Sequence, residues 1–129
     1  MKPQINTDEH RLNEITEKII GCAYTVANSL GCGFLEKVYE NALAHEMRKA
    51  CLAVETQKKI QVMYDGLIVG DYCCDLLVEK GVLVELKAVQ ALDDVHIAQC
   101  LNYLRATGLR LCLLINFGRP RIQIKRLIL

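Results

Sequence analysis

Two acidic residues and one lysine interrupt apolar segments in the middle of this 129-residue sequence. Asp75 lies within YCCDLLVE, and both Glu85 and Lys87 lie within VLVELKAV, whose other residues are all apolar. An unpaired charge in a protein interior is strongly unfavourable, so these side chains must pair with each other, with a neighbouring group or with a metal ion. Their placement therefore marks the two segments as a candidate site.

The spacing of these residues brings their side chains together. Glu85 and Lys87 are two positions apart, so they share one face of a strand. A turn at Lys80 and Gly81 would fold the two segments into a hairpin, in which Asp75 lies opposite about residue 86 and close to Glu85. Two neighbouring carboxylates repel unless a cation lies between them, and an incomplete set of oxygen ligands favours Mg²⁺ or Mn²⁺. The alternative is a structural ion pair of Lys87 with either carboxylate, without a metal.

The rest of the sequence predicts an α+β fold in which helices pack on a mixed central sheet. Apolar residues at spacings of three and four indicate helices, and alternating or continuous apolar residues indicate strands. Asp65-Gly66 predicts a type I′ hairpin turn, an acidic pair at 93–94 can cap a helix, and Gly108 can close it. The predicted helices span about residues 8–30, 34–50 and 94–107, and the predicted strands span about residues 54–64, 67–79, 82–88, 109–117 and 121–129. The predicted order is ααβββαββ, and the length suits one domain.

Composition limits the possible functions. With 16 basic and 15 acidic residues the net charge is +1, which argues against a strongly basic, sequence-blind polyanion binder but leaves room for a local basic groove. No apolar run approaches the length that spans a bilayer, and the N-terminus lacks the apolar segment of a secretory signal, so we expect a cytoplasmic protein. Five tyrosines, two phenylalanines and no tryptophan provide little support for a base-stacking platform.

The sequence has seven cysteines, an odd number, and no two of them have the C-x-x-C spacing. Neither a disulfide framework nor a zinc ribbon is therefore indicated. Most lie in apolar segments, where a reduced cysteine behaves as a small apolar residue. A redox or soft-metal protein is the alternative. Cys73 and Cys74 should point to opposite faces of their strand, and their position beside Asp75 suggests sensitivity to oxidation.

Three motifs together resemble one family. Asp75 followed by Glu85-Leu86-Lys87 resembles the D…(D/E)-x-K signature of the PD-(D/E)XK nuclease superfamily, which has the restriction-endonuclease-like fold. The segment 99–103 resembles the Q-x-x-x-Y motif of the RecB-like exonuclease branch. The segment 33–39 resembles the G-x-x-E-x-x-Y motif of a family of small prokaryotic proteins in the same superfamily. Cys74 stands where the superfamily name has proline, a residue that is often absent.

The resemblance covers about residues 12–128 and implies both a fold and an activity. It implies one nuclease-like domain over residues 1–129, with a core of about 34–117, an extra N-terminal helix of about 8–30 and an extra C-terminal strand of about 121–128. The implied activity is hydrolysis of phosphodiester bonds in nucleic acid, with DNA favoured over RNA, and the implied cofactor is Mg²⁺ or Mn²⁺.

The resemblance also implies roles for individual residues. The metal would be held by Asp75, Glu85 and the Leu86 carbonyl, with Glu36 as a further ligand. Without the motif, Glu36 would be interpreted as an ordinary exposed carboxylate on a helix. Lys87 would orient the attacking water, help to deprotonate it and stabilise charge on the phosphate.

Other residues would position these groups or contact the substrate. Gln99 and Tyr103, four apart on one helix face, would bridge Lys87, the metal ligands and the phosphate, although Tyr103 alone could be a core aromatic. Tyr39 would pack against Glu36. The candidate substrate contacts are His96, Arg105, Arg119 and Arg121, and each can instead be an ordinary solvated side chain.

A second function remains open on these residues. The chain could be a non-catalytic nucleic-acid-binding or regulatory module on the same fold. Because so small a protein offers limited surface for a duplex, we expect a homodimer or a larger nucleic-acid-processing partner.

Overall fold

The computed structural model describes residues 2–129, with side chains from residue 9 onward. The elements are α1 (Lys2–Leu30), α2 (Glu36–Lys49), β1 (Val54–Tyr64), β2 (Leu67–Val78), β3 (Val82–Lys87), α3 (Asp94–Thr107), β4 (Leu111–Asn116) and β5 (Gln123–Ile128). Their order confirms the predicted ααβββαββ. The first helix begins at Lys2, several residues before the predicted start near residue 8. Position 3 is a proline, which a helix tolerates in its first turn.

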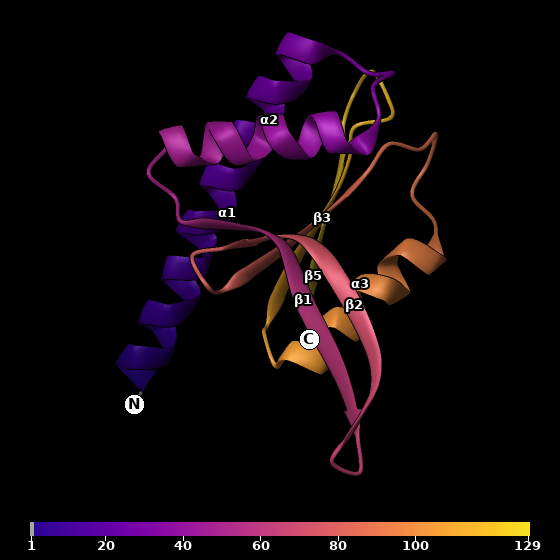
Figure 1. The fold of residues 1–129 in the computed structure, drawn as a ribbon. Coiled ribbons are helices and arrows are strands. Elements are labelled where there is room, and N and C mark those ends of the chain that lie inside the picture. The colour runs from indigo at the N-terminus through magenta and orange to yellow at the C-terminus, as the bar shows by residue number, and fades with distance from the viewer. Residues whose placement is uncertain (1) are drawn as a thin grey trace.

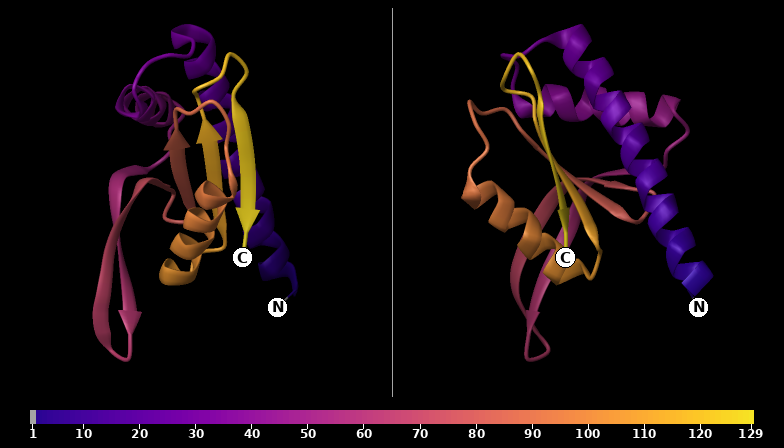
Figure 2. Two further views of the ribbon diagram at one scale, coloured as in Figure 1. Left: turned by 90° about the vertical axis from the view of Figure 1, so that its right-hand side faces the viewer. Right: turned by 180° about the vertical axis from the view of Figure 1, so that it is seen from behind.

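One five-stranded mixed sheet forms the centre of the fold, which confirms the predicted α+β class (Figures 1 and 2). The strands lie in the order β1-β2-β3-β4-β5, and only β3 and β4 are parallel. Helices α1 and α2 pack their apolar residues on one face, and α3 packs on the other. Every residue of β4 is buried, as expected for a continuous apolar strand inside a sheet. None of the described helices is long and apolar enough to cross a membrane.

The hairpin of β1 and β2 leaves the sheet partway along its length. Pairing between β2 and β3 ends at Leu76 and Val84, whereas β2 stays paired with β1 as far as the hairpin turn. That turn has φ angles of 56° at Asp65 and 79° at Gly66, in agreement with the predicted type I′ turn. The outer hairpin therefore projects away from the rest of the sheet, alongside α3 (Figure 2).

The turn between β2 and β3 differs from the prediction by half a residue. Glu79 and Lys80 adopt left-handed conformations, with φ of 53° and 56°, and the register pairs Val78 with Val82. The turn is therefore centred on residue 80 rather than between residues 80 and 81. Continuing that register places Asp75 opposite Glu85, not opposite residue 86 as expected. The two carboxylates thus lie at directly facing positions, where β2 and β3 separate.

A buried amide holds the loop that follows β3. Asn116, which is fully buried, accepts hydrogen bonds from the backbone N–H groups of Val89 (3.0 Å) and Gly118 (2.9 Å) and donates to the Val89 carbonyl (2.9 Å). Phe117 N–H donates to the Lys87 carbonyl at 2.8 Å. The backbone approach at Gly118 is so close that a Cβ there would lie 2.3 Å from the Val89 carbonyl oxygen. The residues after Lys87 are therefore held against the end of β4.

Gly118→Ala tests this close packing. We expect it to lower the free energy of unfolding by about 1–3 kcal/mol, because the added methyl group must displace backbone. Gly21→Ala, at an exposed helical position with no atom within 4 Å of the new Cβ, should instead raise stability by about 0.5–1 kcal/mol. Urea denaturation of both variants measures the difference, and equal stabilities would contradict the packing described.

Candidate active site

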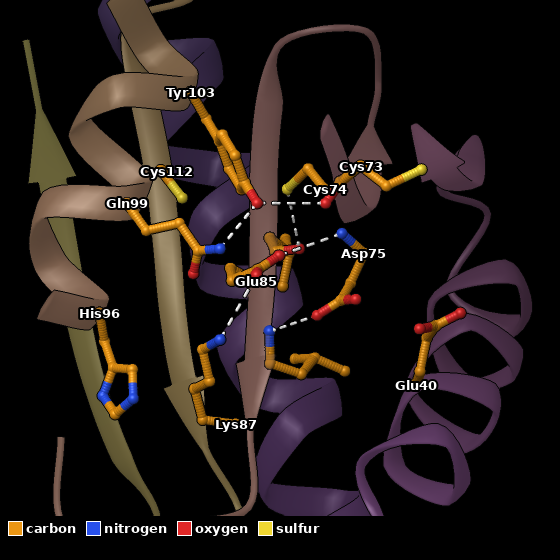
Figure 3. Close-up of polar contacts among 12 residues, drawn as sticks. Glu40, Cys73, Cys74, Asp75, Glu85, Lys87, His96, Gln99, Tyr103 and Cys112 are labelled. Carbon is orange, nitrogen blue, oxygen red and sulfur yellow. Dashed lines mark hydrogen bonds and ion pairs between the residues drawn. The ribbon is translucent and has the colours of Figure 1, made fainter. Parts of the chain in front are cut away.

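The structure brings Asp75, Glu85 and Lys87 together at the point where β2 and β3 separate (Figure 3). Each carboxylate accepts a hydrogen bond from the backbone of the opposite strand: Asp75 N–H donates to Glu85 Oε1 (3.1 Å), and Leu86 N–H donates to Asp75 Oδ2 (2.8 Å). Lys87 Nζ lies 3.7 Å from Glu85 Oε2, and both side chains are largely buried. Backbone groups released from the strand ladder thus fix the positions of the carboxylates.

The surroundings of both carboxylates favour their neutral forms. Burial, followed by the negative charge of Asp75, raises the pKa of Glu85 to about 7. Burial also raises the pKa of Asp75, against the hydrogen bond from Leu86, and the charge of Glu40 raises it further. Lys87 acts in the opposite direction on both groups but does not offset these effects. The site therefore has an excess of negative charge that a proton or a cation can relieve.

The donor set fits a hard divalent cation. Mg²⁺ is commonly held in proteins by one or two carboxylates, with water and substrate phosphate completing its coordination. Asp75 and Glu85 supply two such carboxylates. No buried side-chain oxygen or nitrogen in the described region lacks a hydrogen-bond partner, so the oxygens that remain available face accessible space. Within that region, no three His, Cys, Asp or Glu side chains form a complete ligand set, so a backbone carbonyl, water or substrate would have to complete it.

Helix α3 adds Gln99 and Tyr103 to this cluster. Asp93 caps the helix through its side chain, Gly108 ends it in a left-handed conformation, and both features match the predicted helix. Gln99 Nε2 donates to the Tyr103 hydroxyl at 2.9 Å, and that hydroxyl donates to the Cys73 carbonyl at 3.3 Å. Burial and the charge of Glu85 raise the pKa of Tyr103, so its hydroxyl stays protonated. The helix is thereby attached to β2 beside Asp75.

His96 lies in the first turn of α3, on the Lys87 side of the cluster (Figure 3). Its Nδ1 accepts a hydrogen bond from Asp93 N–H at 3.2 Å, as part of the capping box. In the neutral imidazole the proton must then be on Nε2. His96 is therefore arranged to donate a hydrogen bond from Nε2.

On helix α2 the structure places Glu40, rather than Glu36, beside Asp75. Glu36 is exposed in the first turn of the helix, whereas Glu40 is 4% exposed and extends toward the Asp75 side of the site (Figure 3). Glu40 is held by Lys37 Nζ at 2.9 Å and by Gln57 Nε2 at 2.8 Å. The sequence contained a signal for it, because Glu40 falls three residues before Leu43 in the buried stripe of the helix.

Tyr39 packs against Phe117, not against Glu36 as expected. The two rings stack with centroids 4.7 Å apart, and the Tyr39 hydroxyl donates to the Gly31 carbonyl at 2.6 Å. Phe34 N–H donates to the same hydroxyl at 3.2 Å. Tyr39 thus fixes the start of α2 and, through it, the position of Glu40.

The predicted substrate-contacting arginines do not converge on one point. Arg119 and Arg121 are exposed in the turn between β4 and β5, at the same end of the sheet as Lys87, whose partner in the parallel register is Asn116. Arg105 lies in the last turn of α3, where its Nη1 donates to Asn102 Oδ1 at 2.8 Å. The three residues therefore lie at two separate places in the fold, the β4–β5 turn and the last turn of α3.

The cysteines are free thiols. Cys73 is exposed and Cys74 is buried, so they point to opposite faces as predicted. Burial raises the pKa of the Cys74 thiol, which donates weak hydrogen bonds to the carbonyls of Val84 (3.4 Å) and Leu76 (3.8 Å). Cys74 therefore serves as a neutral core residue under Glu85.

Comparisons with known proteins agree with this geometry. The sequence profile described as the PD-(D/E)XK nuclease superfamily matches residues 13–127. Among curated proteins no sequence matches the chain. Among solved structures, an alkaline exonuclease (LHK-Exo) from Laribacter hongkongensis is similar to 71% of this chain, with a TM-score of 0.53 and 16% sequence identity.

The similarity to the exonuclease is one of fold, and this chain spans 55% of the length of that protein. The superfamily profile covers most of the sequence, including all the residues of the cluster around Glu85. The chain therefore belongs to the PD-(D/E)XK nuclease superfamily.

Proposed function

We propose that the protein is a metal-dependent nuclease that hydrolyses phosphodiester bonds, with DNA as the preferred substrate. The observation that carries the proposal is the facing pair of carboxylates, the half-buried Asp75 and the buried Glu85. Lys87 lies beside them, and its single positive charge does not balance the two carboxylates. Such a cluster in apolar surroundings disfavours its own ionised state, which is typical of a functional site. A divalent cation, Mg²⁺ or Mn²⁺, would relieve the repulsion.

Asp75, Glu85 and the Leu86 carbonyl would hold the ion, with Glu40 in the supporting position expected of Glu36. The ion would supply a polarised phosphoryl oxygen and an acidified water. The Lys87 ammonium would orient the attacking water, favour loss of its proton to solvent through its positive charge, and stabilise charge that develops on the phosphate.

The groups on α3 would position the substrate strand around this centre. Gln99 and Tyr103 would set the phosphate relative to Lys87, since their hydrogen bonds attach the helix to β2. The Nε2–H group of His96 would donate to a phosphate oxygen. Arg105, Arg119 and Arg121 would contact the backbone on either side.

Within the superfamily, we place the chain in the G-x-x-E-x-x-Y family and near the Q-x-x-x-Y exonuclease branch. The support is the segment from Gly33 to Tyr39 and the pair Gln99 and Tyr103. We further propose that residues 1–129 act as one domain and that a second copy or a larger partner extends the surface for nucleic acid.

Lys87→Ala separates catalysis from metal binding. We expect Mn²⁺-dependent cleavage of labelled DNA to fall by about a hundredfold or more, because the positive charge that orients the water and stabilises charge on the phosphate is lost. Mn²⁺ should still raise the melting temperature by about 5–10 °C in this variant and in wild type, but not in Asp75→Ala.

Lys18→Ala, an exposed lysine on α1, is the matched control and should cleave like wild type. Absence of cleavage by wild type, together with Mn²⁺ stabilisation that requires Asp75, would favour the non-catalytic binding module. If Mn²⁺ does not stabilise the protein even when DNA is present, the metal site is contradicted, and Glu85 and Lys87 form only a structural ion pair.

The raised pKa of Glu85 predicts how stability depends on pH. Its stabilising contribution is fully present below the unfolded value of 4.5 and is lost as pH rises through about 7. Without metal, wild type should therefore lose up to about 3 kcal/mol relative to Glu85→Gln between pH 4.5 and 8. Urea denaturation of both proteins in EDTA measures this difference, and parallel curves would contradict it. Mn²⁺ at pH 8 should restore the stability of wild type alone.

Two glutamates one turn apart on α2 form another matched pair. Glu40→Gln should weaken Mn²⁺ binding by about tenfold, because a buried negative charge beside Asp75 is removed. Glu36→Gln should change binding by less than about twofold, since Glu36 is exposed and charges in water are screened. Calorimetric titration with Mn²⁺ measures the affinity of both variants. A larger loss of affinity in Glu36→Gln than in Glu40→Gln would assign the metal-supporting role to Glu36.

A further inference from the structure

A groove of about 780 Å³ lies between the projecting β1–β2 hairpin and α3. The hairpin contributes Val62, Met63 and Tyr72, and α3 contributes Gln99, Tyr103 and Arg105. Gln99 and Tyr103 thus belong both to this groove and to the cluster around Glu85 and Lys87. The groove therefore adjoins that cluster through Gln99 and Tyr103.

The groove contains an exposed aromatic ring on a rigid base. Tyr72 is 54% exposed, and its ring lies 6.1 Å from that of Tyr103, centroid to centroid, with a tilt of 54°. On its own strand, Gly70 makes room for the ring, since a Cβ there would lie 3.3 Å from Tyr72 Cε2. One side of the Tyr72 ring is therefore packed against protein, and the rest is open to a ligand.

The chemistry of the lining suits a nucleotide. Among the described residues that line it, Arg105 is the one that carries a charge, which is positive, and the amides of Gln99 and Asn102 provide hydrogen-bonding groups. The Arg105 guanidinium donates to Asn102 Oδ1, which leaves the amide nitrogen of Asn102 as a donor. An aromatic face beside a positive charge and amide groups is the combination that binds single-stranded nucleic acid.

We propose that this groove holds an unpaired nucleotide of the substrate strand, with its base stacked on Tyr72. The inference rests on the proposed nuclease function and specifies its substrate: single strands, or the frayed ends of a duplex. A base inside a duplex has both faces covered by its stacked neighbours and cannot present one to Tyr72. The groove thereby selects for unpaired nucleotides next to the cleaved bond.

Equilibrium binding tests the assignment independently of turnover. The probe is a fluorescein-labelled phosphorothioate oligothymidine, which resists cleavage, presented in Mn²⁺ either as a single strand or as a blunt duplex. Wild type should bind the single strand more tightly. Tyr72→Ala should weaken single-strand binding by about 5- to 100-fold, the range expected for loss of one stacked base.

Two controls define the cause. Tyr72→Phe keeps the ring and should bind like wild type, whereas a loss equal to that of Tyr72→Ala would assign binding to the hydroxyl and overturn stacking. Tyr24→Ala removes a tyrosine of similar exposure (46%) on α1 and should have no effect.

The remaining outcomes separate this inference from the proposed function. Cleavage of ordinary DNA by wild type, with normal strand binding by Tyr72→Ala, overturns only the groove assignment. Strand binding that depends on Tyr72, without any cleavage, overturns only the nuclease proposal and leaves the groove assignment standing. Failure of wild type to bind the single strand, or a preference for duplex, overturns the groove assignment. Dimerisation that Tyr72→Ala abolishes, with no strand binding, would identify a second copy as the occupant instead.

Discussion

The separation of β2 from β3 at Asp75 and Glu85 is the constraint on which the site depends. As long as two strands remain paired, their backbone groups satisfy each other and the side chains at facing positions are free to be apolar. Here the ladder stops at Leu76 and Val84, and the next backbone amides donate to carboxylates across the gap. An apolar residue at either position would remove the side-chain acceptor that one of those amides has here. The carboxylates therefore serve the backbone at the end of the ladder as well as being suited to a metal.

The same separation creates the surroundings of the site. Beyond Asp75 the β1–β2 hairpin turns away from the sheet, while β3 continues beside β4 to Lys87. The space that opens between hairpin and α3 becomes the groove lined by Tyr72 and Tyr103. The cluster around Glu85 and the groove are thus two consequences of one change in strand pairing. The raised pKa of Glu85 is expected to make the metal-free fold less stable at neutral pH than at acid pH, as in a site that is organised for a ligand.

Local signals in the sequence predicted most of the fold. The bounds of β1 agree with the prediction. Helix α3 is capped at Asp93, one of the two expected cap residues, and ends at Gly108 as expected, because hairpin turns and helix caps depend on a few adjacent residues. The pairing of Asp75 with Glu85 was predicted only to within one residue, since left-handed conformations at Glu79 and Lys80 are unusual for these residue types. Helical spacing indicates that Glu40 is buried, but its hydrogen bond from Gln57 and the buried hydrogen bonds of Asn116 depend on contacts between distant segments, which spacing along one element does not reveal.

The aromatic residues show that composition alone does not predict which side chains the fold brings together. With so few aromatic residues, the sequence offered little reason to expect a stacking surface, yet the fold places two tyrosines together beside the cluster. Tyr103 belongs to both the groove and the cluster around Glu85. Its hydroxyl is hydrogen-bonded to Gln99 and to the Cys73 carbonyl, and its ring lies next to that of Tyr72. Burial keeps that hydroxyl protonated, so it remains a fixed donor across the neutral pH range. A base in the groove and a phosphate at Lys87 would therefore be held in one fixed relation, which is what cleavage at a defined bond requires.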